Sequence, residues 1–297
     1  MNQEYSLINS IVKVGSVRDY IQLTKPRLTL LVIMSSVVVY IWALTDAANF
    51  VNVFLLGLGG FMVAGSANAL NQIIEREHDK NMHRTKERPL AADRLSPMPA
   101  FIFAAILAII GGAILWFVFN PLTALLALFS LVMYAVIYTP LKRISNLAVF
   151  VGAIPGAVPP LLGYLAATGT FTTAAWFLFC VQFLWQFPHF WAIAWKLDED
   201  YKRAGFNLLP SGYKDKKSAF QILLYSFSLI PISFMPLWLN FGGNILVVSL
   251  LLMGIMMFVL SVAHYKQLAS KTALRVMFAS FIYLPVVLAG LLLDKFL

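Results

Sequence analysis

Residues 50–79 read FVNVFLLGLGGFMVAGSANALNQIIEREHD, an apolar run through residue 74 followed by a charged end. A helix of about 20 apolar residues crosses the ~30 Å hydrocarbon core of a bilayer. The run is long enough for that, and a helix satisfies its own backbone hydrogen bonds where no water is available. This stretch therefore predicts a membrane-spanning helix whose polar end lies at the membrane surface.

Eight further apolar runs of similar length follow the same rule, at 28–45, 99–119, 122–140, 147–168, 172–195, 218–239, 244–264 and 272–293. The whole chain is 60% hydrophobic and 12% charged, against roughly 45–50% and about 25% in soluble domains. This composition excludes a soluble fold and a disordered chain, and the single cysteine excludes a disulfide scaffold. We expect one all-α domain over 1–297, a polytopic integral membrane protein with about nine transmembrane helices.

The positive charges lie almost entirely on one side of these predicted spans. The net charge is +9, and the long connections 75–98 and 196–217 carry most of the Lys and Arg, whereas only Lys295 falls on the opposite side. The positive-inside rule explains the excess without a nucleic-acid partner. It predicts a cytoplasmic N-terminus, an outer C-terminus and a cytoplasmic segment 1–27, with an interfacial helix as one alternative for that segment.

Five polar side chains share one face of the helix predicted over residues 50–79. At 100° per residue they fall within an arc of about 100°, and Glu77 points the opposite way. The five are Asn68, Asn71, Gln72, Glu75 and Asp79. A ladder of carboxylates on one face repels itself, so a cation must lie against it. Two alternatives are open: a salt-bridge network with the following basic residues, or Mg²⁺, which prefers oxygen ligands and substrate phosphates.

A second polar stripe lies in the run 172–195. If the helix continues past Pro188, a set of side chains falls on one face about 80° wide: Gln182, Gln186, His189, Lys196 and Asp200. Such a face inside a membrane is costly unless it lines a cavity or finds partners. Proline residues in the same region have two interpretations, namely ordinary kinks or helices that open a central cavity towards the cytoplasm.

Acidic and basic residues at the ends of two spans that leave the membrane on the same side suggest one site. It would hold a diphosphate headgroup through divalent cations and house a long apolar tail in the helix bundle. A transporter with an intramembrane polar path is a different possibility. The short, almost uncharged outer connections argue against transport, because a transporter needs polar access from both sides.

The motif Asn71-x3-Glu75-x3-Asp79, followed by MHRTKERPL at 82–90, resembles the UbiA superfamily of intramembrane aromatic prenyltransferases. Segments 24–27, 138–143 and 156–160 match as well, and the resemblance runs from about residue 18 to the end of the ninth span. WQFPHF at 185–190 and the Asp-Tyr-x-x-Ala-Gly pattern at 200–205 point to the heme farnesyltransferase branch. Glu75 stands where the superfamily usually has Asp, and Lys196 stands where it often has a second acid.

The resemblance implies transfer of a farnesyl group from farnesyl diphosphate to a vinyl group of heme b. It implies an enzyme of a prokaryotic inner membrane and a downstream partner that converts heme O to heme A.

The resemblance also implies the site residues. The catalytic and Mg²⁺-binding residues would be Asn71, Glu75, Asp79 and Asp200. The diphosphate-binding residues would be Arg84, Arg88, Lys142, Arg143 and Lys196. His189 and Gln186 would contact the heme, and the alternative acceptor is a quinone-precursor ring or a chlorin.

Overall fold

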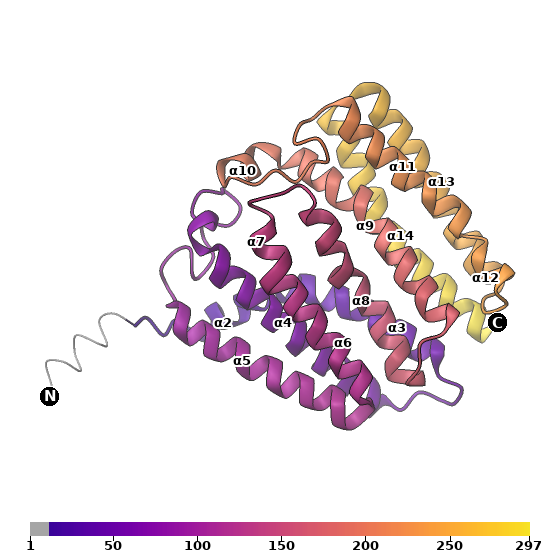
Figure 1. Cartoon of the computed structure of the whole chain (residues 1–297). Coiled ribbons are helices and arrows are strands. Elements are labelled where there is room, and N and C mark those ends of the chain that lie inside the picture. The colour runs from indigo at the N-terminus through magenta and orange to yellow at the C-terminus, as the bar shows by residue number, and fades with distance from the viewer. Residues whose placement is uncertain (1–11) are drawn as a thin grey trace, which may run out of the picture.

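The structure is a computed structural model that describes residues 12–297, so the first part of the predicted segment 1–27 lies outside the described residues. Every regular element in the described range is helical (Figure 1). The elements are α2 Val17–Leu23, α3 Pro26–Ala43, α4 Phe50–Asp79, α5 Pro97–Ile114, η1 Leu115–Phe119, α6 Pro121–Val132, η2 Met133–Tyr138, α7 Thr139–Leu141, α8 Ala148–Thr168, α9 Thr173–Lys196, α10 Asp198–Arg203, α11 Lys216–Ile232, α12 Met235–Trp238, α13 Asn244–Gln267 and α14 Ser270–Phe296.

Nine helical segments in the described range are long and apolar enough to span a membrane, as the sequence predicts. Three of them are composite: π-helical turns extend α5 and interrupt the α6–α7 segment, and the short α12 follows α11. The two ends of the bundle differ. Figure 1 shows α10 at one end, and α12 and the C-terminus at the other. The first of these is the end that the charge distribution predicts to be cytoplasmic.

Local sequence sets the helix ends. Asn49, Asn120 and Thr172 each accept a hydrogen bond from a backbone N–H of the helix that follows, in α4, α6 and α9. Such caps satisfy N–H groups that have no partner inside the helix. Gly169 ends α8 in the left-handed conformation, with φ at 69°, which a glycine adopts without strain. These residues thus mark short turns between consecutive spans.

The central helices are α8 and α9, whose apolar windows are 61% buried, the largest share among the spans. α8 packs against α3 and α9, and α9 packs against α11 and α14. Three prolines lie inside α8 without ending it. A small cavity of about 30 Å³ lies between α3, α8, α9 and α14, and mainly apolar side chains line it. A large open central cavity therefore stays a prediction.

One expectation about helix continuity is wrong. α9 does run through Pro188, but it ends at Lys196, and Leu197 separates it from α10. Leu197 has φ and ψ of −100° and 15°, outside the α-helical region. Asp200 therefore belongs to a separate short helix and does not continue the polar face of α9.

Candidate active site

The polar face of α4 is its buried face. Asn68, Asn71, Gln72, Glu75 and Asp79 are each at most 8% exposed. Glu77 is exposed on the opposite side, where it pairs with Arg76 and Lys80. Burying two carboxylates in a largely apolar bundle is costly unless cations and hydrogen-bond donors surround them. The surroundings of these two acids therefore define the candidate site.

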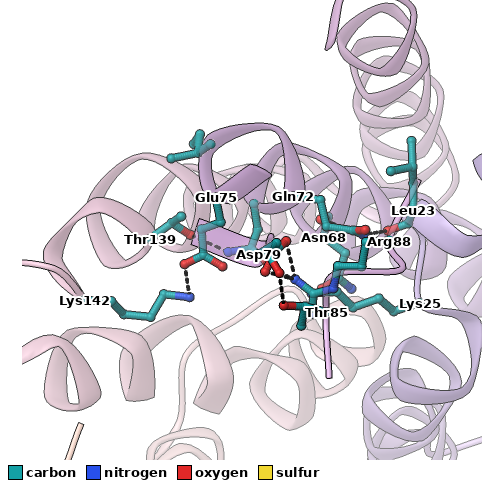
Figure 2. Close-up of polar contacts among 12 residues, drawn as sticks. Leu23, Lys25, Asn68, Gln72, Glu75, Asp79, Thr85, Arg88, Thr139 and Lys142 are labelled. Carbon is teal, nitrogen blue, oxygen red and sulfur yellow. Dashed lines mark hydrogen bonds and ion pairs between the residues drawn. The ribbon is translucent and has the colours of Figure 1, made fainter. Parts of the chain in front are cut away.

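Each acid of this pair has a basic partner from another segment. Lys142, which follows α7, forms an ion pair with Glu75. Arg88 approaches Asp79, with its Nη1 atom 2.9 and 2.8 Å from the two carboxylate oxygens. Figure 2 shows Lys142 and Arg88 reaching the acids from opposite sides. Of the basic residues that follow α4, Arg88 thus forms an ion pair that the salt-bridge alternative predicts, whereas the partner of Glu75 comes from the segment after α7.

The amides of the same face fasten the neighbouring segments to α4. Gln72 Nε2 donates to the Leu23 carbonyl at 2.9 Å, and Asn71 Nδ2 donates to Thr139 Oγ1 at 3.1 Å. These bonds hold the end of α2 and the start of α7 beside the acids, as Figure 2 shows for Gln72 and Leu23. The position of Lys142, three residues beyond Thr139, follows from this anchoring.

Lys25 belongs to the site, although sequence reasoning gave it no role. Its Nζ donates to Asn71 Oδ1 at 3.2 Å. Burial, together with the nearby charges of Arg88 and Lys142, holds the pKa of Lys25 well below its usual value. Its backbone is left-handed, with φ at 47°, at the residue before Pro26 starts α3. The sequence signal was the Thr-Lys-Pro-Arg segment, but a lysine before a span looks like an ordinary topological charge.

The side chains of the remaining basic candidates form no ion pair with Glu75 or Asp79 among the described residues. Arg84 is exposed, and its guanidinium lies 5.9 Å from the centre of the Tyr201 ring. Arg143 is also exposed and donates to the Ile74 carbonyl at 3.0 Å. Lys196 is exposed at the end of α9. Their predicted contacts with a diphosphate stay predictions.

Asp200 organises the loop that follows α4. It accepts hydrogen bonds from the backbone N–H groups of His83 at 3.0 Å and Arg84 at 3.4 Å, and it pairs with Arg203. Burial by itself raises the pKa of Asp200, but the bonds from Arg203, His83 and Arg84 outweigh this and lower it. In this structure Asp200 thus holds the loop that carries Arg84 and Arg88, and its predicted role as a metal ligand stays a prediction.

The donor set at α4 fits Mg²⁺ shared with a diphosphate. Among residues 12–297, no three His, Cys, Asp or Glu side chains converge closely enough to hold a metal ion. Two buried carboxylates and the amide oxygen of Asn71 nevertheless lie along one helix face. Mg²⁺ is commonly held by one or two carboxylates, with waters and substrate phosphates completing its shell. Lys142 and Arg88 would then turn from the acids to the phosphate oxygens.

His189 forms a second buried cluster, between α9 and α14. Its Nδ1 lies 2.7 Å from Ser280 Oγ, and the hydroxyl of Ser280 donates to the Met277 carbonyl. With its hydroxyl proton directed at the Met277 carbonyl, Ser280 Oγ accepts a hydrogen bond from the His189 tautomer that is protonated on Nδ1. A neutral His189 then carries its free lone pair on Nε2. Trp185 stacks on the imidazole, with ring centres 4.6 Å apart.

Gln186 joins α9 to α8. Its amide Nε2 donates to the carbonyls of Ala153 and Gln182, both at 3.1 Å. A Cβ atom at Gly156 of α8 would lie 2.0 Å from Gln186 Oε1, so a larger residue there would displace the Gln186 amide. In this structure Gln186 is therefore occupied with helix packing, and its predicted contact with heme stays a prediction.

Comparison with known proteins identifies relatives over nearly the whole chain. Residues 31–283 match the UbiA prenyltransferase family. The protoheme IX farnesyltransferase of Cytophaga hutchinsonii is 46% identical over 278 residues, which cover 93% of this chain and 97% of that protein. The protoheme IX farnesyltransferase of Christiangramia forsetii is 42% identical over 283 residues, 94% of each chain.

Solved structures share the fold at low sequence identity. A digeranylgeranylglyceryl phosphate synthase superposes with a TM-score of 0.79 and 19% identity, over 94% of this chain and 98% of that one. A UbiA homolog from Archaeoglobus fulgidus, described with bound GPP and Mg²⁺, gives a TM-score of 0.64 and 12% identity over 92% and 99% of the chains. At these identities the likeness shows the fold.

Proposed function

Because the chain belongs to the UbiA prenyltransferase family, we propose that it transfers a farnesyl group from farnesyl diphosphate to a vinyl group of heme b, giving heme O. The observation that carries this assignment is the identity of 46% and 42% to protoheme IX farnesyltransferases over more than nine-tenths of the chain. Membership of this family argues against the transporter. The same relatives favour heme as the acceptor over a quinone-precursor ring or a chlorin. The protein is an integral membrane prenyltransferase.

The acid pair of α4 and its cations would hold the diphosphate. Glu75 and Asp79, with Asn71 and a contribution from Asp200, would hold Mg²⁺, which neutralises the charge that develops on the leaving group. Lys142, Arg88 and Lys25 surround the same point. They would donate charge-assisted hydrogen bonds to the phosphate oxygens, with Arg84 and Lys196 as further candidates.

Breaking the allylic C–O bond sends its electron pair to the diphosphate and leaves an allylic cation. That cation bonds to the terminal carbon of a heme vinyl group, and water adds to the neighbouring carbon with loss of a proton. The apolar bundle would limit access of water to the first cation. The free Nε2 lone pair that Ser280 leaves on His189 suits contact with the heme iron.

We propose the orientation of the protein in the membrane, and its partners, from the charge distribution and the family together. The Lys and Arg distribution supports a cytoplasmic N-terminus and site, and an outer C-terminus, in the inner membrane of a prokaryote. Farnesyl diphosphate, heme b and the lipid bilayer would be the partners of this single domain. A downstream heme A synthase is a further proposed partner, because such an enzyme would take heme O as its substrate.

Product mass tests the proposal. Membranes that contain the protein, supplied with farnesyl diphosphate, Mg²⁺ and heme b, should give heme that has gained the mass of a farnesyl group plus a hydroxyl group. Glu75→Ala and Asp79→Ala should each lower the rate by roughly 100-fold or more, because the diphosphate loses its metal. Glu77→Ala is the matched control on the exposed face and should retain activity.

Two outcomes would contradict parts of this proposal. Prenylation of a quinone-precursor ring in place of heme would overturn the acceptor. Full activity in both Glu75→Ala and Asp79→Ala, with normal membrane insertion, would overturn the diphosphate site.

A further inference from the structure

A cavity of about 360 Å³ opens at the predicted cytoplasmic end, and Lys142, the ion-pair partner of Glu75, is one of the residues that line it. One wall is the segment 142–146 after α7, and the other is the segment 207–213 before α11. Its volume falls within the usual range for ligand sites, roughly 300–1,000 Å³. It is about twelve times the volume of the apolar cavity between α3, α8, α9 and α14, given as about 30 Å³.

The lining selects for an anion. Two cationic residues line the cavity, Lys142 and Arg143, and Asn207, Ser145 and Tyr213 add neutral polar groups. None of the lining residues is acidic. Arg143 uses one guanidinium nitrogen on the Ile74 carbonyl, which leaves its other N–H groups for a ligand. A guanidinium with several free donors suits a carboxylate or a phosphate.

The walls are held in place by hydrogen bonds that do not involve the two cations. Asn146 donates from its amide to the Pro210 carbonyl and so joins the two segments. Ser211 Oγ lies 2.8 Å from both Ser218 Oγ and Asp215 Oδ1, and Asp215 caps α11 through the N–H of Ser218. The second wall is therefore attached to the first turn of a membrane-spanning helix. Such support fixes the shape of the cavity before a ligand binds.

Lys142 links this cavity to the candidate site. It lines the cavity and also forms the ion pair with Glu75 of α4. A ligand whose anionic end lies near Arg143 would extend towards the acid pair, where the proposed reaction takes place. Heme b has this shape, because its two carboxylates lie on one edge of the porphyrin and its vinyl groups lie on the other side of the ring.

We infer that the cavity between 142–146 and 207–213 binds the carboxylate edge of the porphyrin acceptor, with Arg143 as its principal contact. The inference rests on the proposed function, since it concerns the acceptor of that reaction. It departs from the sequence-based role of Arg143 in binding diphosphate. It also separates the two anions of the reaction, with the diphosphate at Asp79 and Arg88 and the carboxylates at Arg143.

The test compares two acceptors, heme b and its dimethyl ester, in the detergent-solubilised full chain. Arg143→Gln should raise the KM for heme b roughly tenfold or more, the loss expected for a charged hydrogen bond. It should leave the KM for farnesyl diphosphate and the activity on the ester close to wild type. Arg143→Lys keeps the charge and should recover part of the affinity for heme b.

Arg275→Gln is the matched control, because Arg275 is exposed and does not line the cavity. A raised KM for farnesyl diphosphate in Arg143→Gln would show that the cavity serves the diphosphate, and would overturn the inference. Equal defects on heme b and on the ester would overturn it as well. A wild-type protein that binds heme b with an Arg143-dependent affinity but forms no product would contradict the proposed function alone.

Discussion

At the scale of single residues, the proton on His189 is set by its neighbour. Ser280 is one helical turn from Met277 and gives its only proton to that carbonyl, so it accepts the imidazole N–H. The backbone carbonyl of Ser280 also accepts a hydrogen bond from Trp185 Nε1 at 3.1 Å. Ser280 thus orients both the imidazole and the indole that stacks on it, and it acts as a positioning residue.

Replacing Ser280 tests this arrangement. Ser280→Ala removes the acceptor for His189 Nδ1, so the imidazole can carry its proton on either nitrogen. We expect a weaker iron ligand, seen as a changed absorption spectrum of bound heme b, and a rate lowered roughly 10- to 100-fold. Ser280→Thr keeps the hydroxyl and should restore both. An unchanged heme spectrum in Ser280→Ala and in His189→Ala would remove iron binding from the role of His189.

At the scale of the elements, the backbones of α3 and α8 approach each other closely at Gly163. A Cβ atom on Gly163 of α8 would lie 2.0 Å from the backbone oxygen of Ser36 in α3. The hydroxyl of Ser36 crosses the same contact and donates to the Pro159 carbonyl at 2.7 Å. α3 begins next to Lys25, so the contact also fixes one side of the candidate site.

Gly163→Ala should therefore separate the two helices. We expect a loss of about 1–3 kcal/mol in stability, the usual cost of overpacking, together with lower activity. Gly112→Ala is the control, because its nearest neighbour outside the helix backbone is a flexible Leu128 side-chain carbon at 3.5 Å. Thermal unfolding in detergent compares the two. Equal Tm values for the two variants would show that α3 and α8 can move apart at little cost.

The short helix α2 depends on ionised Asp19. The bond from the Ser16 backbone, then the bonds from the Ser16 side chain and Arg94, lower the pKa of Asp19 from 3.8 to about 2. Arg94 also ties α2 to the loop before α5, with Nε 2.9 Å from Asp19 Oδ1. Since the folded pKa is the lower one, the stabilisation is complete above the unfolded value and disappears as the pH falls towards 2.

Asp19→Asn should thus lower Tm near neutral pH and have a progressively smaller effect as the pH falls from about 4 towards 2. Asp46→Asn, at an exposed position in the turn between α3 and α4, should show no such trend. Thermal unfolding in detergent at several pH values measures both. A difference between wild type and Asp19→Asn that persists at the acid end would contradict the assignment to ionised Asp19.

Sequence patterns predict these elements well, and their contacts less well. The run 28–45 corresponds to α3 at Pro26–Ala43, and the run 244–264 to α13 at Asn244–Gln267, because length and hydropathy largely determine a membrane span. The break at Leu197 has no glycine or proline to mark it. It comes with the bonds from the loop after α4 to Asp200, whose partner His83 is 117 residues away in sequence.

In the candidate site, too, the sequence predicts the helix face but not the contacts that other helices make with it. The face that carries Glu75 and Asp79 follows from helix geometry alone, and the structure buries it. The place of Lys25 depends on a left-handed backbone before Pro26 and on packing against α4, neither of which a hydrophobic pattern reports. Ser280 has no motif of its own, and only the packing of α14 on α9 brings it to His189, 91 residues away.

At the scale of the whole molecule, the last spanning helix is bonded both to the helix that precedes it and to the first spanning helix. Asp294 near the end of α14 accepts hydrogen bonds from Gly243 at 2.7 Å and from Ile245 and Leu246, both at 3.0 Å, at the start of α13. Lys295 donates to the carbonyls at the end of α3, the first spanning helix. A negative charge at a helix N-terminus and a positive charge at a helix C-terminus both interact favourably with the helix dipole.

Lys295→Met should therefore loosen the contact between α3 and α14 at the end opposite the candidate site. Three carbonyls lose their donor, namely those of Ile41, Trp42 and Leu44, at a cost of about 1–3 kcal/mol. We expect a lower Tm in detergent with an unchanged KM for farnesyl diphosphate, because the acid pair is at the other end of the bundle. Lys271→Met, at an exposed position near the start of the same helix, is the control. A raised KM in Lys295→Met would instead mean that the distance between α3 and α14 affects the substrate site, because α3 starts next to Lys25.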